Sequence, residues 1–168
     1  MPVDYQRRIQ ELKLHLPKAP QPSGSYRPVV ISGEYAFLSG QISKTSDGRI
    51  LSGKLGQDLT LEAGQAAAKC AALNVLGVIH DLIGFARFER MIRVVGYVQS
   101  SAGFYEISQV MNGASDFFLE VLGESGLHAR SAVGMASLPL NAAVEIEATI
   151  QIIKSGHSEK PRRLRRTP

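Results

Sequence analysis

Apolar residues recur at every third or fourth position in three segments of the chain, a spacing typical of helices with one buried face. The first predicted helix covers residues 3–16 and is ended by prolines at positions 17, 20 and 22. The second is a long, alanine-rich helix that begins after Thr60 as its cap and stops at Gly84. The third covers residues 105–122, and the glycines that follow break its pattern.

Other segments are rich in β-branched and aromatic residues and predict strands. Two such runs within residues 28–42 are separated by Ser32-Gly33-Glu34, which predicts a hairpin with Gly33 in the turn. Residues 44–56 are polar and contain glycines, so we expect a loop with a short strand at positions 50–51. A strand at 88–100 should pack on the long helix, and strands at 131–139 and 143–153 should form a closing antiparallel hairpin.

This order of elements predicts an α+β fold, a mostly antiparallel sheet with two main helices packed on one face. The length of 168 residues suits one domain with one core, and no internal repeat is present. We divide the chain into an N-terminal helix and linker (1–22), the domain itself (23–153) and a basic tail (154–168).

The net charge of +4 is concentrated in the tail, which holds six Lys/Arg and one acidic residue. The remainder of the chain has thirteen basic and fourteen acidic residues, so it carries no basic surface of the kind that nucleic acids require. We expect the tail to be disordered and solvated. Because the remainder is not basic, nucleic acid is not expected as a partner except through this tail. Binding of RNA or anionic lipid through it stays open.

Cysteine and histidine are scarce, which bounds the chemistry. The single cysteine, Cys70, excludes an internal disulfide and is expected in the core, and four scattered histidines predict no metal site. No apolar run reaches 18 residues and the amino terminus is charged throughout, so neither a membrane span nor a signal peptide is predicted. These features favour a reduced, cytoplasmic location.

One segment, residues 128–148 (HARSAVGMASLPLNAAVEIEA), resembles the signature of the reactive intermediate deaminase (Rid, or YjgF) superfamily. An arginine, Arg130, precedes a small residue, a strand ends in Leu-Pro, and a Val-Glu-Ile-Glu strand places Glu145 fifteen residues after the arginine. Upstream, residues 39–42 (Ser-Gly-Gln-Ile) follow Tyr26 at the family's spacing, and Asn112 opens a stretch similar to the family's Asn-bearing helix. The resemblance spans about residues 24–153.

The resemblance implies a chorismate mutase-like fold, a homotrimer, and ligand pockets in the clefts between subunits. It also implies hydrolysis of reactive 2-imino and enamino acids to 2-keto acids and ammonia, with no metal and no cofactor. Some members of the superfamily carry an older label, translation-inhibiting endoribonuclease. The expected partner is therefore a small metabolite that bears a carboxylate.

The chemistry of the matched residues suits such a substrate. The guanidinium of Arg130 fits both oxygens of a carboxylate, and Glu145 could accept a proton from the attacking water. The catalytic candidates are Arg130, Glu145, Tyr26 and Ser39, and the substrate-binding candidates are Arg130, Gly40, Asn112 and Ala132.

Each assignment has a structural alternative. Arg130 could form an ion pair with a glutamate, Ser39 could end a strand, and Tyr26 could be a packing residue. Glu147 shares a strand face with Glu145, so only the family register selects between them. His128 precedes the arginine, but a loop histidine is more often structural or solvated.

The predicted closing hairpin would place Arg130 opposite about residue 151, roughly 20 Å from Glu145 at ~3.3 Å per residue. We therefore expect neighbouring subunits to contribute the two residues to a shared pocket.

The chain departs from the deaminase pattern at Ala132, where a cysteine or polar residue is common, and at Gly134, which is usually bulkier. Three functions are consequently weighed: an imine and enamine deaminase, which leads, a non-catalytic module that binds or senses carboxylates, and an RNA-acting protein.

Overall fold

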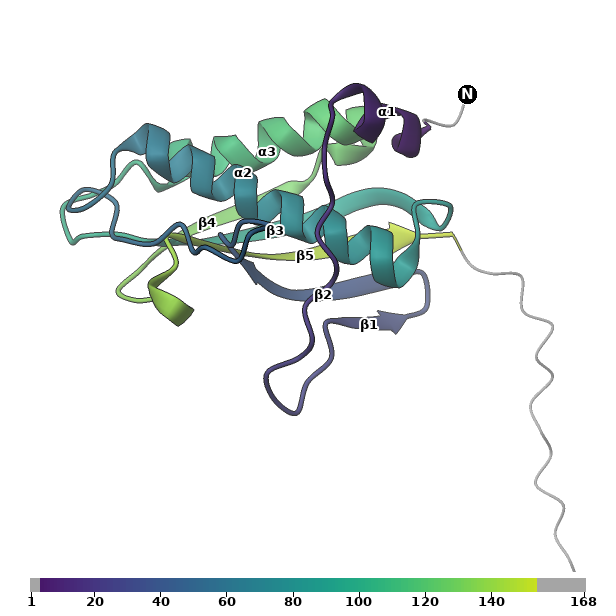
Figure 1. The fold of residues 1–168 in the computed structure, drawn as a ribbon, viewed down its shortest axis with the longest axis horizontal. Helices are drawn as coiled ribbons and strands as arrows, with labels where there is room; N and C mark the ends of the chain where they lie inside the picture. Colours follow the sequence, from purple (N-terminus) through teal and green to yellow (C-terminus); the bar gives the residue numbers. More distant parts are fainter. Residues whose placement is uncertain (1–3, 154–168) are drawn as a thin grey trace, which may run out of the picture.

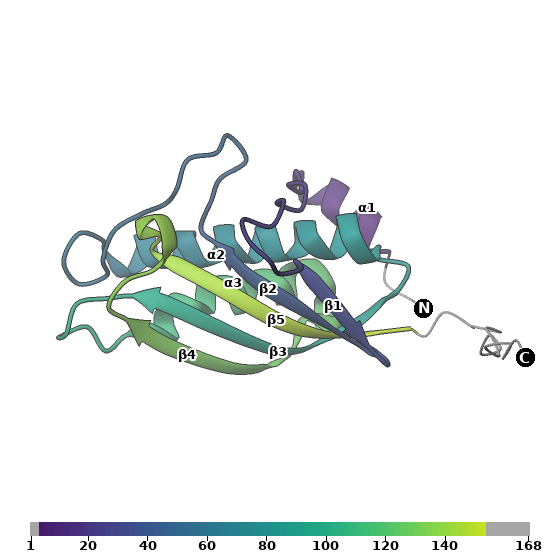
Figure 2. The same cartoon turned by 90° about the horizontal axis from the view of Figure 1, so that it is seen from below.

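A computed structural model describes residues 4–153 and contains one five-stranded sheet in the order β1-β2-β5-β3-β4. Figure 2 shows this order across the sheet, with β5 in the centre. All neighbouring strands are antiparallel except β3 and β4, which run parallel. The predicted α+β fold with a mostly antiparallel sheet is confirmed; the strands are β1 (Val29–Ser32), β2 (Tyr35–Ile42), β3 (Phe88–Gln99), β4 (Ala129–Met135) and β5 (Val144–Ile152).

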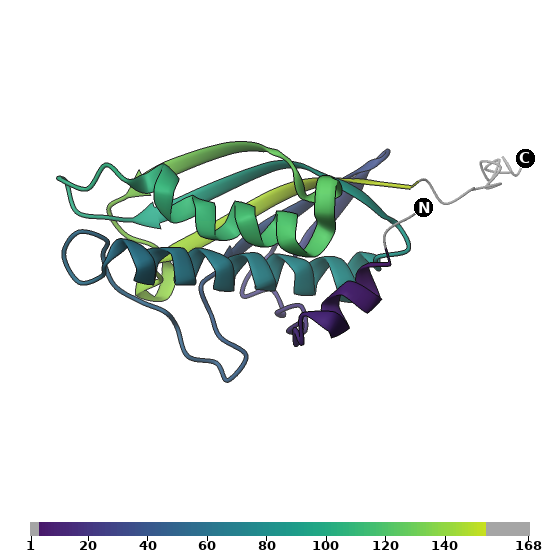
Figure 3. The same cartoon turned by 90° about the horizontal axis from the view of Figure 1, so that it is seen from above.

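Two long helices, α2 (Leu61–Val78) and α3 (Ile107–Leu122), cover one face of the sheet (Figures 1 and 3). The Thr60 side chain accepts a hydrogen bond from the Ala63 amide and so caps α2 as predicted. The helical path continues through a π-helical turn, Ile79–Ile83, and ends at Gly84, whose φ of 82° suits glycine. Both long helices were therefore predicted correctly in type and position.

The segment Leu61–Ile83 is long and apolar enough to cross a membrane by composition alone, with a mean hydropathy of 1.4. More than half of that window, 56%, is buried inside the domain. The apolar character of this helix is thus explained by its place in the core, where it packs on β2 and β5 of the sheet and along α3.

The layers pack closely because small residues face the crowded positions. Four alanines of α2, at positions 67, 68, 71 and 72, are fully buried, and its two glycines are buried as well. Gly96 of β3 lies under the Met111 side chain, which would overlap any Cβ there. On β5, even-numbered residues from Val144 to Ile152 are buried under the helices and odd-numbered residues face the other side. The core is therefore defined by one face of the sheet.

At Gly113, α3 lies close against α2, because a Cβ there would overlap the backbone of Gln65. Since backbone cannot move as a side chain tip can, we expect Gly113→Ala to lower the free energy of unfolding by about 1–2 kcal/mol, despite alanine's better helix propensity. Gly103→Ala is the matched control, since the Cβ of an alanine at this position would meet no neighbouring atom within 4 Å. Urea unfolding of both variants would contradict the prediction if their midpoints were equal.

The predicted hairpin of β1 and β2 is confirmed, with Ser32 opposite Tyr35 and Gly33 at a φ of 63° in the turn. The face of this hairpin and of the other strands that points away from the helices is not covered by any described residue (Figure 2). This face is called the open face below.

The predicted closing hairpin is wrong. β4 pairs only with β3, in parallel, and β5 lies on the other side of β3, where it also pairs with β2. The unit β3-α3-β4 is a strand–helix–strand crossover, which brings its two strands together in parallel. The 3-10 turn Pro139–Asn141, with Leu140 and Asn141 at positive φ, then carries the chain past the end of β3 to the central position.

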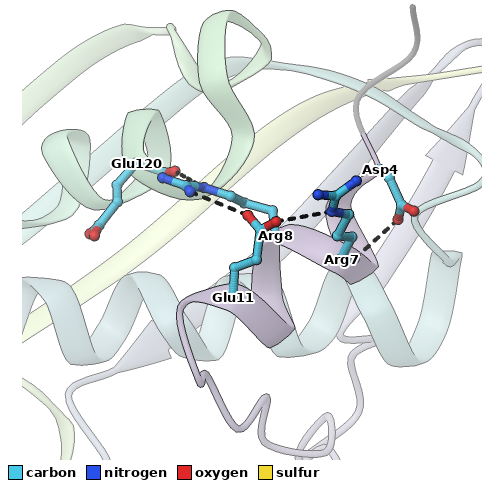
Figure 4. Close-up of polar contacts among 5 residues, drawn as sticks. All are labelled: Asp4, Arg7, Arg8, Glu11 and Glu120. Atoms are coloured by element: carbon cyan, nitrogen blue, oxygen red, sulfur yellow. Dashed lines mark hydrogen bonds and ion pairs between the residues drawn. The ribbon is translucent and has the colours of Figure 1, made fainter.

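The N-terminal helix α1 is shorter than predicted, Tyr5–Glu11 instead of residues 3–16. The Asp4 side chain caps it, and Arg8 donates a hydrogen bond to the Glu120 carbonyl of α3 at 3.1 Å (Figure 4). The Tyr5 ring packs on Phe85 and Phe88. Beyond α1, the leucines at positions 12, 14 and 16 are half-buried and the residues between them are exposed. Burial at every second position is typical of an extended segment. The predicted basic tail, residues 154–168, lies outside the described residues.

Candidate functional site

Arg130 lies on the edge strand β4, opposite Val94, and its side chain points toward the helices. The guanidinium donates from Nη1 to Asn112 Oδ1 (3.0 Å) and Ser115 Oγ (3.0 Å), and from Nη2 to the Ser108 carbonyl (3.2 Å). All three acceptors belong to α3, which therefore fixes the position of the charged group. The Asn112 candidate is thus brought beside Arg130.

The acceptors around Arg130 are neutral, so the positive charge is not compensated. No ion pair joins Arg130 to an acidic side chain within residues 4–153, so the glutamate pairing considered as the alternative is not found there. Its Nε likewise donates to no residue in this range. A guanidinium with an unused Nε edge and an uncompensated charge can accept a carboxylate side-on.

Ser115 and His128 extend this group, and the sequence did not single out Ser115. His128 contacts Ser115 Oγ through Nε2 (3.1 Å) and the Gly126 carbonyl through Nδ1 (2.6 Å). Burial lowers the pKa of His128, and the positive Arg130 acts in the same direction, against the hydrogen bond with Gly126. The available signal was the spacing of Ser108, Asn112 and Ser115, which places three polar residues on one face of a helix.

A second cluster forms on the open face around Glu145, which is half-buried on β5. Its carboxylate lies over Gly40 so closely that a Cβ at that position would overlap it. Tyr26 adjoins this cluster in sequence, since the next residue, Arg27, is hydrogen-bonded to Ser39. Hydrogen bonds with Ser23 lower the pKa of Tyr26, while desolvation and the negative charge of Glu145 act in the opposite direction. Ser39 belongs to the same corner, where its hydroxyl donates to the Arg27 carbonyl at 2.7 Å.

The predicted site residues therefore separate into two half-sites, one with Arg130, Asn112 and Ala132, the other with Tyr26, Ser39, Gly40 and Glu145. Tyr97 of β3 lies opposite Glu145, and Arg130 lies beyond β3 on the helix side. The premise that Arg130 faces about residue 151 across a hairpin is thus wrong. Its conclusion, that one chain does not bring Arg130 and Glu145 together, holds because the two side chains leave opposite faces of the sheet.

Ala132 and Gly134 lie on the same face of β4 as Arg130. Ala132 packs against the core, and a Cβ at Gly134 would lie 3.4 Å from Ile107. Neither residue supplies a polar side chain beside Arg130, so the polar groups of this half-site come from α3 and His128.

Glu147 shapes the electrostatics of the second half-site. Burial raises the pKa of Glu145, and the negative charge of Glu147 on the same strand face raises it further. We expect Glu147→Gln to lower the pKa of Glu145 toward its ordinary value, because the repulsion is removed while burial remains. NMR titration of the Glu145 carboxyl carbon measures this pKa directly, and an unchanged midpoint would contradict the prediction. The control is Glu89→Gln, because Glu89 lies on a strand but does not contribute to the pKa shift of Glu145.

Two cavities lie elsewhere. One, of about 210 Å³, is on the open face between Phe37, Arg93 and Glu147. The other, of about 290 Å³, lies between α2, the N-terminal segment and residues 44–46, and Cys70 lines it, so this cysteine is half-buried instead of in the core. Neither cavity includes Arg130. Within residues 4–153 no three His, Cys, Asp or Glu side chains gather as metal ligands would.

The fold is α+β and chorismate mutase-like, with a five-stranded sheet and two helices on one face. Its candidate acid-binding group is an arginine of the edge strand that is held by the second long helix. The family model described as "YjgF/chorismate mutase-like, putative endoribonuclease" matches residues 6–149, and the chain belongs to this family. The match begins within the N-terminal segment that the sequence resemblance left outside.

Individual relatives are similar to this chain over most of its length. Protein TCP17 of Trypanosoma cruzi is 42% identical over 146 residues, which cover 86% of this chain and 91% of that protein. A 2-iminobutanoate/2-iminopropanoate deaminase of Dermatophagoides farinae is 31% identical over 137 residues, covering 81% and 92%. The crystal structure of Atu1372 from Agrobacterium tumefaciens, a protein of unknown function, superposes with a TM-score of 0.79 at 40% identity, covering 89% and 94%.

Proposed function

We propose that the protein hydrolyses 2-imino and enamino acids to 2-keto acids and ammonia, in clefts where neighbouring copies of the chain meet in a homotrimer. One copy contributes Arg130 and the α3 residues around it, and the next contributes Glu145, Tyr26, Ser39 and Gly40. The similarity to a relative named as an iminobutanoate deaminase supports the reaction class.

The observation that carries the proposal is the state of Arg130. Its charge is held in place by neutral acceptors and is left uncompensated within residues 4–153. Holding a charged guanidinium without a counter-charge costs free energy. A bound carboxylate offsets this cost, since one charge-assisted contact contributes about 1.5–3 kcal/mol. This is enough to orient a small acid with respect to the other half-site.

The open face supports assembly. It carries large apolar side chains that are substantially exposed, among them Tyr35 (40%), Phe37 (49%) and Val133 (41%). Apolar groups gathered on one uncovered side of a sheet mark a contact surface. Glu145 lies on the same face, so a neighbouring copy that covers this face also approaches Glu145.

The chemistry needs only groups of this chain. With the substrate carboxylate on Arg130, water adds to the imine carbon, the C=N electron pair moves to nitrogen, and Glu145 takes a proton from the water. Glu145 then returns this proton to the nitrogen and the C–N bond breaks, with its electron pair leaving on ammonia. The hydroxyl proton passes to the ammonia as the C=O bond forms, so iminium and water become keto acid and ammonium.

The test is the rate of keto acid release from an imino acid generated freshly in the assay. The imine hydrolyses by itself in buffer, so the result that supports the proposal is an acceleration proportional to protein concentration. The alternative, a non-catalytic module that binds carboxylates, is favoured by the absence of a polar side chain at Ala132 and Gly134. It predicts keto acid binding that survives Glu145→Ala, with no acceleration above buffer.

A further inference from the structure

The hydrogen bonds of His128 determine which of its nitrogens carries the proton. Nδ1 lies 2.6 Å from the Gly126 carbonyl oxygen, which can only accept, so Nδ1 is the protonated nitrogen. In neutral histidine Nε2 is then an acceptor, and the Ser115 hydroxyl, 3.1 Å away, donates to it. Ser115 Oγ accepts in turn from Arg130 Nη1. The chain of bonds therefore has one defined direction.

Protonation of His128 reverses the middle bond. Nε2 then donates to Ser115 Oγ, which also accepts from Arg130, and the hydroxyl hydrogen of Ser115 is released to point elsewhere. Since Ser115 Oγ is 3.0 Å from Arg130 Nη1, that hydrogen becomes a second donor beside the guanidinium. Ser115 is thus occupied by His128 in one state and available to the ligand in the other.

We infer that His128, through Ser115, is a positioning residue that couples the binding of an acid group at Arg130 to the uptake of one proton. This rests on the proposed function, since it requires that Arg130 hold the acid group of the substrate. The bound form then has the guanidinium and the Ser115 hydroxyl as donors, while the free form offers the guanidinium alone. Affinity for a carboxylate should therefore rise as the pH falls.

The surroundings of His128 give the same sign. From β4 it faces the charged Arg130, from α3 the Ser115 hydroxyl and the edge-on ring of Phe118, and from its own segment the Gly126 carbonyl. Burial and Arg130 lower the pKa of His128, which favours its neutral form in the absence of an acid group. A ligand carboxylate compensates the charge of Arg130 and adds a negative charge nearby, and both effects favour the protonated form.

The experiment measures binding of pyruvate, a stable 2-keto acid that stays ionised throughout, by calorimetry at about pH 5.5 and about pH 8. We expect the Kd to be roughly tenfold lower at the acidic pH, the effect of one hydrogen bond to a charged group. Proton uptake is read separately, from the dependence of the binding heat on the ionisation enthalpy of the buffer.

Variants locate the proton. In Ser115→Ala and His128→Gln the ratio of the pyruvate Kd at about pH 8 to that at about pH 5.5 should fall close to one, whatever the affinity of each variant at the alkaline pH. Glu145→Gln is the matched control for the other titrating group of the proposed pocket, and it should retain the gain. Persistence of the pH dependence in His128→Gln, or its loss in Glu145→Gln, would assign the proton to another group and overturn the inference.

The two proposals fail differently. Pyruvate binding that requires Arg130 but does not change with pH overturns the proton coupling and leaves the proposed function intact. Binding that is absent, or equal in Arg130→Ala, removes the acid-binding site and with it both proposals.

Discussion

Arg130→Ala should lower kcat/KM for keto acid release at least about 100-fold, the largest loss expected from a single substitution in this chain. The substitution removes the charge-assisted contacts to the substrate carboxylate, which contribute about 1.5–3 kcal/mol, and also the orientation of the imine carbon toward water. Arg130→Lys keeps the charge but lacks the planar fork, so we expect an intermediate loss of about tenfold. The measurement is the initial rate of keto acid release at low substrate concentration.

The control for this experiment is Arg7→Ala, which removes an arginine whose side chain is 76% exposed on α1. It should retain full activity, because within the described part of the chain the Arg7 side chain pairs only with Glu11, and its backbone amide, which the substitution keeps, donates to the cap residue Asp4. Circular dichroism and gel filtration of Arg130→Ala separate a loss of chemistry from a loss of fold. A folded Arg130→Ala protein with natural activity would refute the anchor role.

Mixing two inactive variants should restore activity. If each cleft takes Arg130 from one copy and Glu145 from the next, Arg130→Ala and Glu145→Gln subunits mixed in equal amounts form competent clefts at about one position in four. Activity near a quarter of the natural value is therefore expected after unfolding and refolding the two proteins together. Two half-sites on opposite faces of one sheet make this the sharpest test of a shared pocket.

The same variants refolded separately and then combined are the control, because intact assemblies should exchange subunits slowly. Co-refolding of Arg130→Ala with an Arg130→Ala, Glu145→Gln double variant should give no recovery, since every cleft then lacks the arginine. If the first mixture also stays inactive while gel filtration shows mixed assemblies, the two residues do not serve one cleft.

Local patterns predicted most elements of this fold. The α2 helix follows from its cap, its alanines and its terminal glycine, and the β1–β2 hairpin from one turn glycine, all within short stretches of sequence. The error at residues 12–16 has a physical origin, because a leucine at every second position fits an extended chain as well as a loosely spaced helix.

Strand pairing could not be predicted in the same way, because it depends on contacts between distant segments. β4 and β5 are neighbours in sequence with a turn between them, which favours a hairpin, yet the crossover through α3 commits β4 to β3. The arrangement of the candidate site was unpredictable for the same reason. The family register supplied Arg130 and Glu145, but only the assembled sheet places them on opposite faces and brings Ser115 and His128 to the guanidinium.

The central place of β5 has a consequence for how the chain is made. Before residues 144–152 leave the ribosome, the β1–β2 ribbon and the β3-α3-β4 unit have no strand to join them, because β5 bonds to both. Until then each piece exposes a long unpaired edge to its surroundings, a condition that favours aggregation over native assembly. The sheet therefore cannot close until residues 144–152 have been synthesised and inserted between β2 and β3.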